Sequence, residues 1–146
     1  MIIPETKIRR IIDSVGVERT QPEVVRVVSK RARDCGRYLI TEAEEKAEYA
    51  DRKTLMNRDL PADLSREPIE LTRNSMKRLI KQNSDLKSTS KFKKTLASIT
   101  EDYISSLVQE AYAFCQADKR KTLSMEDLTK TVGERESSLK RRWNLD

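Results

Sequence analysis

The sequence has no histidine and only two cysteines, Cys35 and Cys115, together with three glycines and four prolines in 146 residues. Without histidine, imidazole catalysis is excluded, and the two cysteines alone cannot form a Cys/His metal cluster. So few glycines and prolines exclude collagen-like and linker-like chains and favour long helices. We therefore expect an all-α protein with no metal and no cofactor.

Long apolar runs are also missing. The sequence contains no stretch of about 20 apolar residues that could span a membrane. Residues 1–4 (Met-Ile-Ile-Pro) are followed at once by charges, unlike a signal peptide. No Gly-rich phosphate loop and no nucleophile beside a base are evident, so an enzyme is the least favoured class and no small-molecule substrate is expected. These absences predict a cytosolic or nucleoid-like protein without a membrane partner.

Charge is plentiful and uneven. Lys and Arg total 30 against 24 Asp and Glu, which gives a net charge of +6. Residues 1–68 hold 14 basic and 13 acidic side chains, whereas residues 69–146 hold 16 and 11. An excess of basic residues favours a polyanionic partner.

The chain repeats itself at a shift of 68 residues. The segment Arg-Lys-Thr-Leu at 52–55, with Asp-Leu at 59–60, returns at 120–123 and 127–128. The same ungapped shift places Arg10 on Arg78 and Leu39 on Leu107. A constant register over about fifty residues indicates two homologous units rather than chance similarity.

Each unit has the pattern of a short helix, a loop, a long helix, a loop and another short helix. In the first unit, apolar residues at 8, 11, 12 and 15 follow helical spacing, and Gly16 is suited to the position just after the helix. Thr20 to Glu23 fit a capping box, and helical spacing then continues for about thirty residues. The second unit shows the same pattern.

A thirty-residue helix is roughly 45 Å long, and its own unit supplies only two short helices to cover it. Units of this size bury too little surface to be stable alone. We therefore expect the two long helices to cross and to bury each other's apolar stripes, as in an intramolecular pseudo-dimer. Two unrelated helical hairpins in one bundle would show similar stripes and stay open as an alternative.

These residues resemble the histone fold of archaeal histones, twice in tandem. The resemblance spans residues 3 to about 60 and about 71 to 132. It depends most on the Arg-Lys-Thr loop and its trailing Asp after a long helix. The other matching positions in the first unit are Pro4, Ile8, Arg10-Ile11-Ile12, Gly16, Glu18-Arg19 and Gly36-Arg37.

The resemblance implies a histone doublet whose two folds clasp in a handshake. Its expected domains are residues 1–64, residues 65–136 and a basic C-terminal tail, 137–146. It also implies binding of duplex DNA at three points on one curved face. The side chains that would contact DNA are Arg10 and Arg78 at the centre, Arg19, Lys121 and Thr122 at one end, and Lys53, Thr54 and Lys87 at the other. In the family's pattern, Arg52 with Asp59 and Arg120 with Asp127 are structural clamps of the second loop.

The chain departs from the family's pattern in three places. Lys87 replaces the loop arginine and Ser84 a glycine, so this loop should insert less well into a groove. Pro61 falls inside the first unit's expected last helix, which should be displaced, bent or cut short, with 61–65 as a linker. Tyr49 and Ala117 stand where the family often uses a histidine to join pairs into polymers, so assembly through at least one end is in doubt.

The sequence thus predicts a non-enzymatic chromatin protein that packages, bends or wraps double-stranded DNA with little sequence specificity. Further copies of the chain could join through the end of a long helix and the last helix. It would lie on the chromosome in the cytoplasm, or in a virion or host nucleus if viral. Two alternatives remain: a histone-fold subunit of a transcription or regulatory complex that acts mainly on protein, and an unrelated helical adaptor.

Overall fold

The computed structural model describes residues 3–62 and 67–133. We call these two ranges the first half and the second half. The elements of the first half are α1 (Glu5–Ser14), β1 (Arg19–Thr20), α2 (Pro22–Tyr49), β2 (Thr54–Leu55) and a 3-10 turn, η1 (Asn57–Asp59). Those of the second half are α3 (Arg73–Asn83), β3 (Lys87–Ser88), α4 (Ser90–Ala117) and β4 (Thr122–Leu123), after which residues 125–133 are helical.

The repeat in the sequence is also a repeat in the structure. Adding 68 to the bounds of β1, α2 and β2 gives the bounds of β3, α4 and β4, and α1 corresponds to α3 with one residue more at its end. Even the exceptional backbone conformations recur, because Asp51 and Lys119 both have a positive φ, 58° and 56°. The 68-residue repeat therefore describes local structure as well as composition.

Both long helices end in the same motif. The N–H of Arg52 donates to the carbonyl of Ala47, and the N–H of Asp51 to that of Glu48. Arg120 and Lys119 make the equivalent bonds 68 residues later. This is the Schellman arrangement, which needs a left-handed residue just after the helix and reverses the chain sharply. The reversal directs each Arg-Lys-Thr segment back along the helix it follows.

The starts of the long helices differ. Thr89 caps α4, its hydroxyl accepting the N–H of Phe92 at 3.0 Å. The capping box predicted at Thr20 is wrong: Gln21 occupies the N-cap without a side-chain bond, and Pro22 begins α2. The Gln21 side chain instead accepts the N–H of Met125 from the other half, at 3.3 Å. Gly16 follows α1 with a φ of +102°, as its position after the helix predicts.

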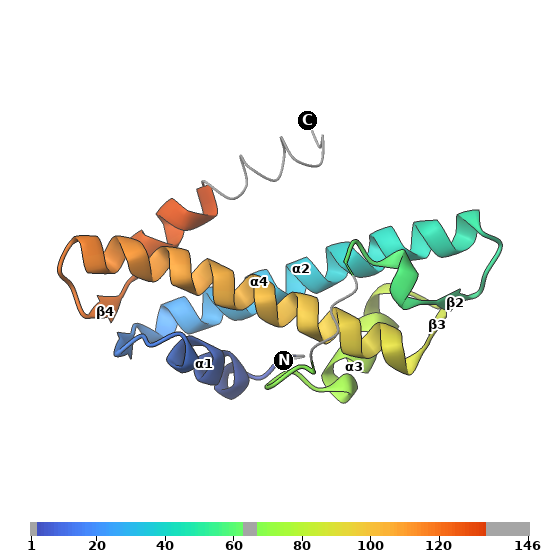
Figure 1. Ribbon diagram of the computed structural model, residues 1–146, viewed down its shortest axis with the longest axis horizontal. Helices are drawn as coiled ribbons and strands as arrows, with labels where there is room; N and C mark the ends of the chain where they lie inside the picture. Colours follow the sequence, from blue (N-terminus) through green and yellow to red (C-terminus); the bar gives the residue numbers. More distant parts are fainter. Residues whose placement is uncertain (1–2, 63–66, 134–146) are drawn as a thin grey trace.

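The strands pair between the halves, not within them. β1 lies parallel to β4, with Arg19 opposite Thr122, and β2 lies parallel to β3, with Thr54 opposite Lys87. Figure 1 shows α2 and α4 crossing, with the two strand pairs near opposite ends. One continuous apolar core joins the halves, from Ile8 and Ile12 of α1 to Leu79 and Ile80 of α3. The crossing predicted for the long helices is present.

The first half lacks the last helix of the expected pattern. The turn η1 ends at Asp59, Leu60 is extended, and Pro61 follows at an exposed position. The second half has helical residues at the corresponding place, 125–133. A proline interrupts a helix because it removes an N–H donor and clashes with the preceding turn. Within residues 57–62, the expected short last helix is therefore reduced to the single turn η1. The predicted domain boundary at 64/65 and most of the predicted linker lie outside the described residues, as does the tail at 137–146.

The segment before α3 is attached to α4 through a buried carboxylate. Glu101 accepts the backbone N–H groups of Ile69, Glu70 and Leu71 at 2.9, 2.6 and 2.6 Å. Thr72 then caps α3 by accepting the N–H of Ser75. Because Glu101 is almost fully buried, these three donors satisfy a charge that would otherwise be costly to desolvate. These bonds hold the chain just before α3 in a defined position on α4.

We expect Glu101→Gln to lower the free energy of unfolding by roughly 2–3 kcal/mol, because an amide donor would face backbone donors that a carboxylate now satisfies. Urea denaturation measures this loss. Glu45→Gln, an exposed change on α2, is the control and should change stability by less than about 0.5 kcal/mol. Equal effects of the two substitutions would contradict the role given to Glu101.

Candidate nucleic-acid interface

One end of the molecule combines cations from both halves at the β1–β4 pair. Arg19 and Lys121 are exposed and Thr122 is half-buried. The pairing of Arg19 with Thr122 places these side chains together, although they are more than 100 residues apart in the sequence. A further backbone bond, from the N–H of Gln21 to the carbonyl of Leu123 at 3.1 Å, continues the pair into the start of α2. The structure therefore brings together the three residues predicted for this end.

The opposite end repeats this arrangement at β2–β3. Lys87 stands opposite Thr54, and its N–H donates to the carbonyl of Lys53 at 3.2 Å. Thr89 donates its N–H to the carbonyl of Leu55 at 3.1 Å, so the pair leads into the start of α4. Lys53 and Lys87 are exposed. This end also brings together the three residues predicted for it.

Between the two ends lie α1 and α3, which run along the same side of the crossed long helices (Figure 1). They carry the two residues predicted for the central contact, Arg10 and Arg78, both exposed. Arg10 forms an ion pair with Glu70 at 3.6 Å. Arg78 has no ion pair within residues 3–62 and 67–133. Any anion at the centre would thus compete with Glu70 for Arg10.

The two Arg–Asp pairs of the repeat shape the loops that carry these cations. Arg52 donates to both carboxylate oxygens of Asp59, at 2.9 and 2.5 Å, and also to the carbonyl of Thr54. Asp59 in turn accepts the N–H of Met56 at 2.9 Å. A bidentate guanidinium–carboxylate pair fixes both groups in one plane. The loop between α2 and η1 is therefore tied at its start, middle and end.

Arg120 and Asp127 form the equivalent pair in the second half, with contacts of 3.0 and 2.5 Å. Arg120 also donates to Asp118, and the N–H of Ser124 donates to Asp127 at 3.0 Å. Asp127 is fully buried and Asp59 nearly so. These four residues support the loops from behind, whereas the exposed Lys53 and Lys121 beside them point their charge to solvent.

Both carboxyls of these pairs have a pKa below the ordinary value. For Asp59, the hydrogen bond from Arg52 is the largest cause and outweighs burial. For Asp127, burial raises the pKa, but the hydrogen bonds from Arg120 and Ser124 together lower it further than burial raises it. The carboxylates are therefore charged in the folded protein at neutral pH, and the pairs depend on that charge.

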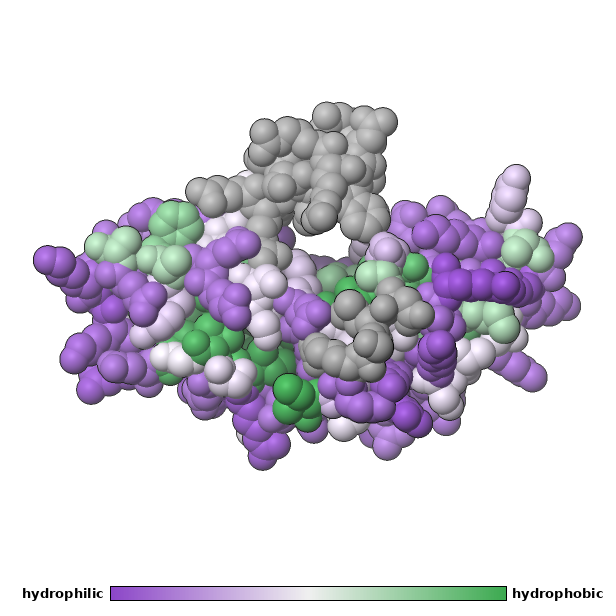
Figure 2. Space-filling view, in the orientation of Figure 1, coloured by the Kyte–Doolittle hydropathy of each residue, from purple (hydrophilic) through white to green (hydrophobic). Residues whose placement is uncertain are grey.

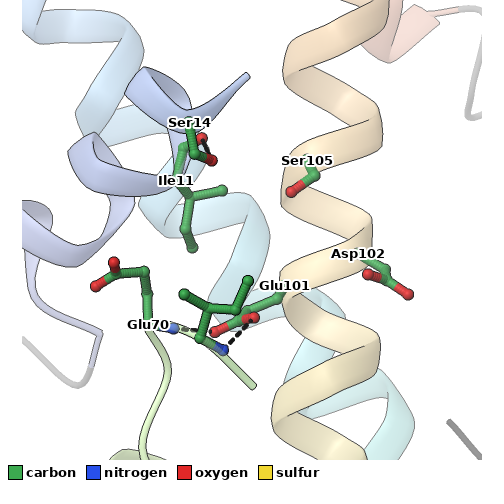
Figure 3. Close-up of a pocket in the computed structure, with 7 residues that line it drawn as sticks. Ile11, Ser14, Glu70, Glu101, Asp102 and Ser105 are labelled. Atoms are coloured by element: carbon green, nitrogen blue, oxygen red, sulfur yellow. Dashed lines mark hydrogen bonds between the residues drawn. The ribbon is translucent and has the colours of Figure 1, made fainter. Parts of the chain in front are cut away.

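A small pocket lies where α1, α4 and the segment before α3 meet. Its volume is about 260 Å³, and Ile11, Ile69, Glu70, Glu101, Asp102 and Ser105 are among its lining residues. Figure 3 shows that the Glu101 carboxylate points to the backbone of this segment and bonds to it. Figure 2 shows hydrophobic residues gathered between α1 and α4 on this face, and Ile69 is 83% exposed. The Glu101 carboxylate in this pocket therefore serves to hold the segment before α3.

The thiols and carboxylates of the described residues show neither a reactive cysteine nor a metal site. Burial raises the pKa of the Cys115 thiol, which lies in the core, so it behaves as a small apolar residue. Cys35, also a free thiol, is half-buried. Within residues 3–62 and 67–133, no three His, Cys, Asp or Glu side chains gather to bind a metal ion. No helix in those same ranges is both long and apolar enough to cross a membrane.

The two positions considered for assembly, Tyr49 and Ala117, both lie at helix ends. Tyr49 closes α2 and is 95% exposed, and Ala117 closes α4 and is also exposed. Near the end of α2, Glu44, Glu45 and Glu48 correspond to Tyr112, Ala113 and Gln116 of α4, whereas Glu42 corresponds to another acidic residue, Glu110. The two ends thus present different surfaces to a neighbouring molecule.

Comparison with solved structures identifies the fold as a histone fold. The crystal structure of the histone from Methanopyrus kandleri superimposes with a TM-score of 0.76 at 18% identity and covers 88% of this chain and 92% of its own. A Thermus thermophilus protein of known crystal structure gives a TM-score of 0.71 at 16% identity, over 99% of both chains. At these identities the likeness concerns the fold alone.

In sequence, residues 69–132 match the family of histone-like transcription factors (CBF/NF-Y) and archaeal histones. The match covers the second half, from the segment bound by Glu101 to the helix after β4. No curated protein matches the chain in sequence. The family match and the solved structures together support the resemblance to archaeal histones.

Two residues that organise the interface escape sequence reasoning, Glu70 and Glu101. Both depend on the segment that joins the halves, which the repeat leaves largely without a counterpart. At the position equivalent to Glu101 the first half has Arg33, so the 68-residue shift gives no sign of a buried carboxylate. The one feature of the sequence that could have indicated the role of Glu101 is its position on the apolar side of a long helix.

We expect the protein to lose stability as the pH falls below about 4. Because the pKa values of Asp59 and Asp127 are lowered by folding, their contribution is complete above the unfolded value of about 3.9 and is lost as the pH falls through the folded values. Urea denaturation between neutral and acidic pH measures this loss. Asp59→Asn should be less stable at neutral pH and should flatten the acid branch; a curve parallel to the wild type would contradict the assignment.

Proposed function

We propose that the chain is a tandem of two histone folds that form a handshake pair within one molecule. The first fold comprises residues 1–64 and the second 65–136, followed by a basic tail at 137–146. The recurrence of both strands, the short first helix and the long helix at a shift of 68 supports this proposal, as does the pairing of strands between the halves. The match to the Methanopyrus histone covers 88% of the chain, too much for one unit of 68 residues.

We infer that this pair binds double-stranded DNA and packages, bends or wraps it, without an enzymatic role. The observation that carries the inference is the parallel pairing that places Arg19 beside Thr122 and Lys87 beside Thr54. Each pair joins a cation to a hydroxyl at the start of a long helix, where backbone N–H groups also favour phosphate. The central cations, Arg10 and Arg78, lie between these ends.

Such contacts give affinity with little base recognition. Cations at three points along a surface recognise phosphates and the width of an inward-facing minor groove, and sequence enters only through the ease of bending. The proposed DNA-contacting residues are therefore Arg10, Arg19, Lys53, Thr54, Arg78, Lys87, Lys121 and Thr122. The location that follows is the nucleoid, or the virion and host nucleus for a viral protein.

A second candidate is a histone-fold subunit of a transcription or regulatory complex. The matched family includes histone-like transcription factors, and its model covers only residues 69–132. The acidic end of α2, with Tyr49 exposed, gives the first half a surface unlike that of the second. Self-association would then be limited to the end formed by α4 and residues 125–133. Negligible affinity for duplex DNA would favour this candidate.

Arg19→Ala and Arg78→Ala should each weaken binding to all duplexes alike. Each removes about one phosphate contact, so the slope of log affinity against log salt should fall by about 0.9. Fluorescence anisotropy with two duplexes of unrelated sequence, over a salt series, measures both effects. Lys130→Ala, on the helix beyond β4, is the control and should leave the slope unchanged. Loss of binding to only one of the two sequences would indicate base recognition instead.

Nuclease digestion of reconstituted complexes tests packaging itself. A protein that wraps DNA protects fragments in regular steps, because each bound molecule covers a fixed length of duplex. A smear without steps, at saturating protein, would reduce the function to coating. Flat affinity between low and moderate salt would reject the phosphate contacts altogether.

A further inference from the structure

The two ends of the proposed interface differ sharply in charge. The segment from α1 through β1 to the start of α2, residues 5–26, contains five basic and four acidic side chains, a net +1. The equivalent segment from α3 through β3 to the start of α4, residues 73–94, contains eight basic and one acidic, a net +7. This second segment alone exceeds the whole chain's net charge of +6.

Three sign reversals, each worth two charges, equal the whole net difference of six charges. They occur at positions that the repeat makes equivalent, on elements that begin at the same place in the two repeats. In each case an acidic residue of the first half corresponds to a basic residue of the second. The pairs are Glu5 and Arg73, Asp13 and Lys81, and Glu23 and Lys91. All but Glu5, which is half-buried, are exposed.

The exposed basic residues of the second segment follow one another along α3, β3 and the start of α4, and we call them the basic surface. Arg73, Lys77 and Lys81 lie four residues apart on α3, so they form one exposed row along the helix, beside its buried residues Met76 and Ile80. Lys91 follows in the first turn of α4. β3 lies between them, where the N–H of Lys87 donates to the carbonyl of Lys53, the residue just before β2. The basic surface therefore extends along α3 to the β2–β3 end of the candidate interface.

Part of this charge is already engaged. Lys94 forms an ion pair with Glu67 at 2.6 Å, Glu67 also lies near Arg73, and Lys93 donates to the carbonyl of Ser88 at 3.4 Å. Asp85, exposed before β3, is the one acidic side chain of the segment. Within the described ranges, no ion pair engages the remaining lysines of the surface, which are Lys53, Lys77, Lys81, Lys87 and Lys91.

The opposite end has fewer cations and nearby carboxylates. Glu18 is adjacent to Arg19, and Glu23 lies in the first turn of α2 just after β1. At the centre, Glu70 engages Arg10 but has no described counterpart beside Arg78. Phosphates approaching the β1–β4 end would meet these carboxylates at close range, and like charges weaken such contacts.

We propose that the interface is asymmetric along the DNA. The primary anchor for duplex phosphates is formed by α3, β3, the first turn of α4 and Lys53, and the β1–β4 end is secondary. This proposal rests on the proposed DNA-binding function. The anchor remains bound as salt rises, while the β1–β4 end releases its DNA first. Because each phosphate contact releases counterions, the end with more available cations has the higher affinity at low salt, and although this affinity falls more steeply, it is the last to be lost.

Acetylation of lysines by a chemical reagent, read by mass spectrometry, tests this in the wild-type protein. With a duplex long enough to reach both ends, DNA should protect Lys53 and Lys87 to a higher salt concentration than Lys121. Loss of protection at the same salt for all three would overturn the proposal but leave DNA binding intact. No protection of any of them at low salt would instead reject the proposed function.

Charge-reversal variants that change the net charge by the same amount give an independent test. Lys81→Asp with Lys91→Glu gives the second half the residues of the first, and should weaken binding at least about tenfold through two lost contacts and two new repulsions. Lys46→Glu with Lys130→Glu changes the net charge equally on other surfaces and should cost less than about threefold. Equal losses would mean that only net charge matters.

The reciprocal exchange completes the set. Adding Asp13→Lys and Glu23→Lys to Lys81→Asp and Lys91→Glu restores the wild-type net charge and moves the excess to the β1–β4 end. Lys121 should then stay protected to a higher salt concentration than Lys53 and Lys87. An unchanged order of release in a folded four-fold variant, checked by circular dichroism, would overturn the proposal.

Discussion

The structure depends on the burial of two long apolar stripes against each other. Neither α2 nor α4 has enough partners in its own half, because each half supplies only short helices. Their crossing joins the two halves in one core and positions every loop. It also decides the strand pairing: β1 meets β4 and β2 meets β3, so each end of the candidate interface combines residues of both halves. One half alone could not form either end.

The sequence predicted those parts of the fold that the repeat encodes. The 68-residue shift and the helical spacing of apolar residues located the long helices, Gly16 ended α1, and Pro61 predicted the shortened last helix of the first half. Prediction failed where a side chain forms a hydrogen bond with the other half of the molecule. Thr20 has the spacing of a capping box, but Gln21 and its partner Met125 decide the start of α2. Such contacts have no local signal.

The sequence predicted which of the candidate residues lie together, but it did not predict their electrostatic surroundings. Position by position, the resemblance selected the residues that the strand pairs bring together, because backbone register follows from the equivalent loops. It could not show that Arg10 is engaged by Glu70, nor that Glu101 fixes the segment bearing Glu70. Glu70 lies in the segment that joins the halves, where the repeat has no counterpart to compare. Its ion pair with Arg10 can therefore be seen only in the folded chain.

The joining of both halves in one chain has a consequence for symmetry. Two copies of one short chain would pair about a two-fold axis, and their ends would be identical by construction. A covalent connection also keeps the partners at a high effective concentration, so that the pair forms independently of how much protein the cell contains. Each half is thereby free to diverge from the other. The segment that Glu101 anchors leads into the second half of such a molecule, whose two ends need not be identical.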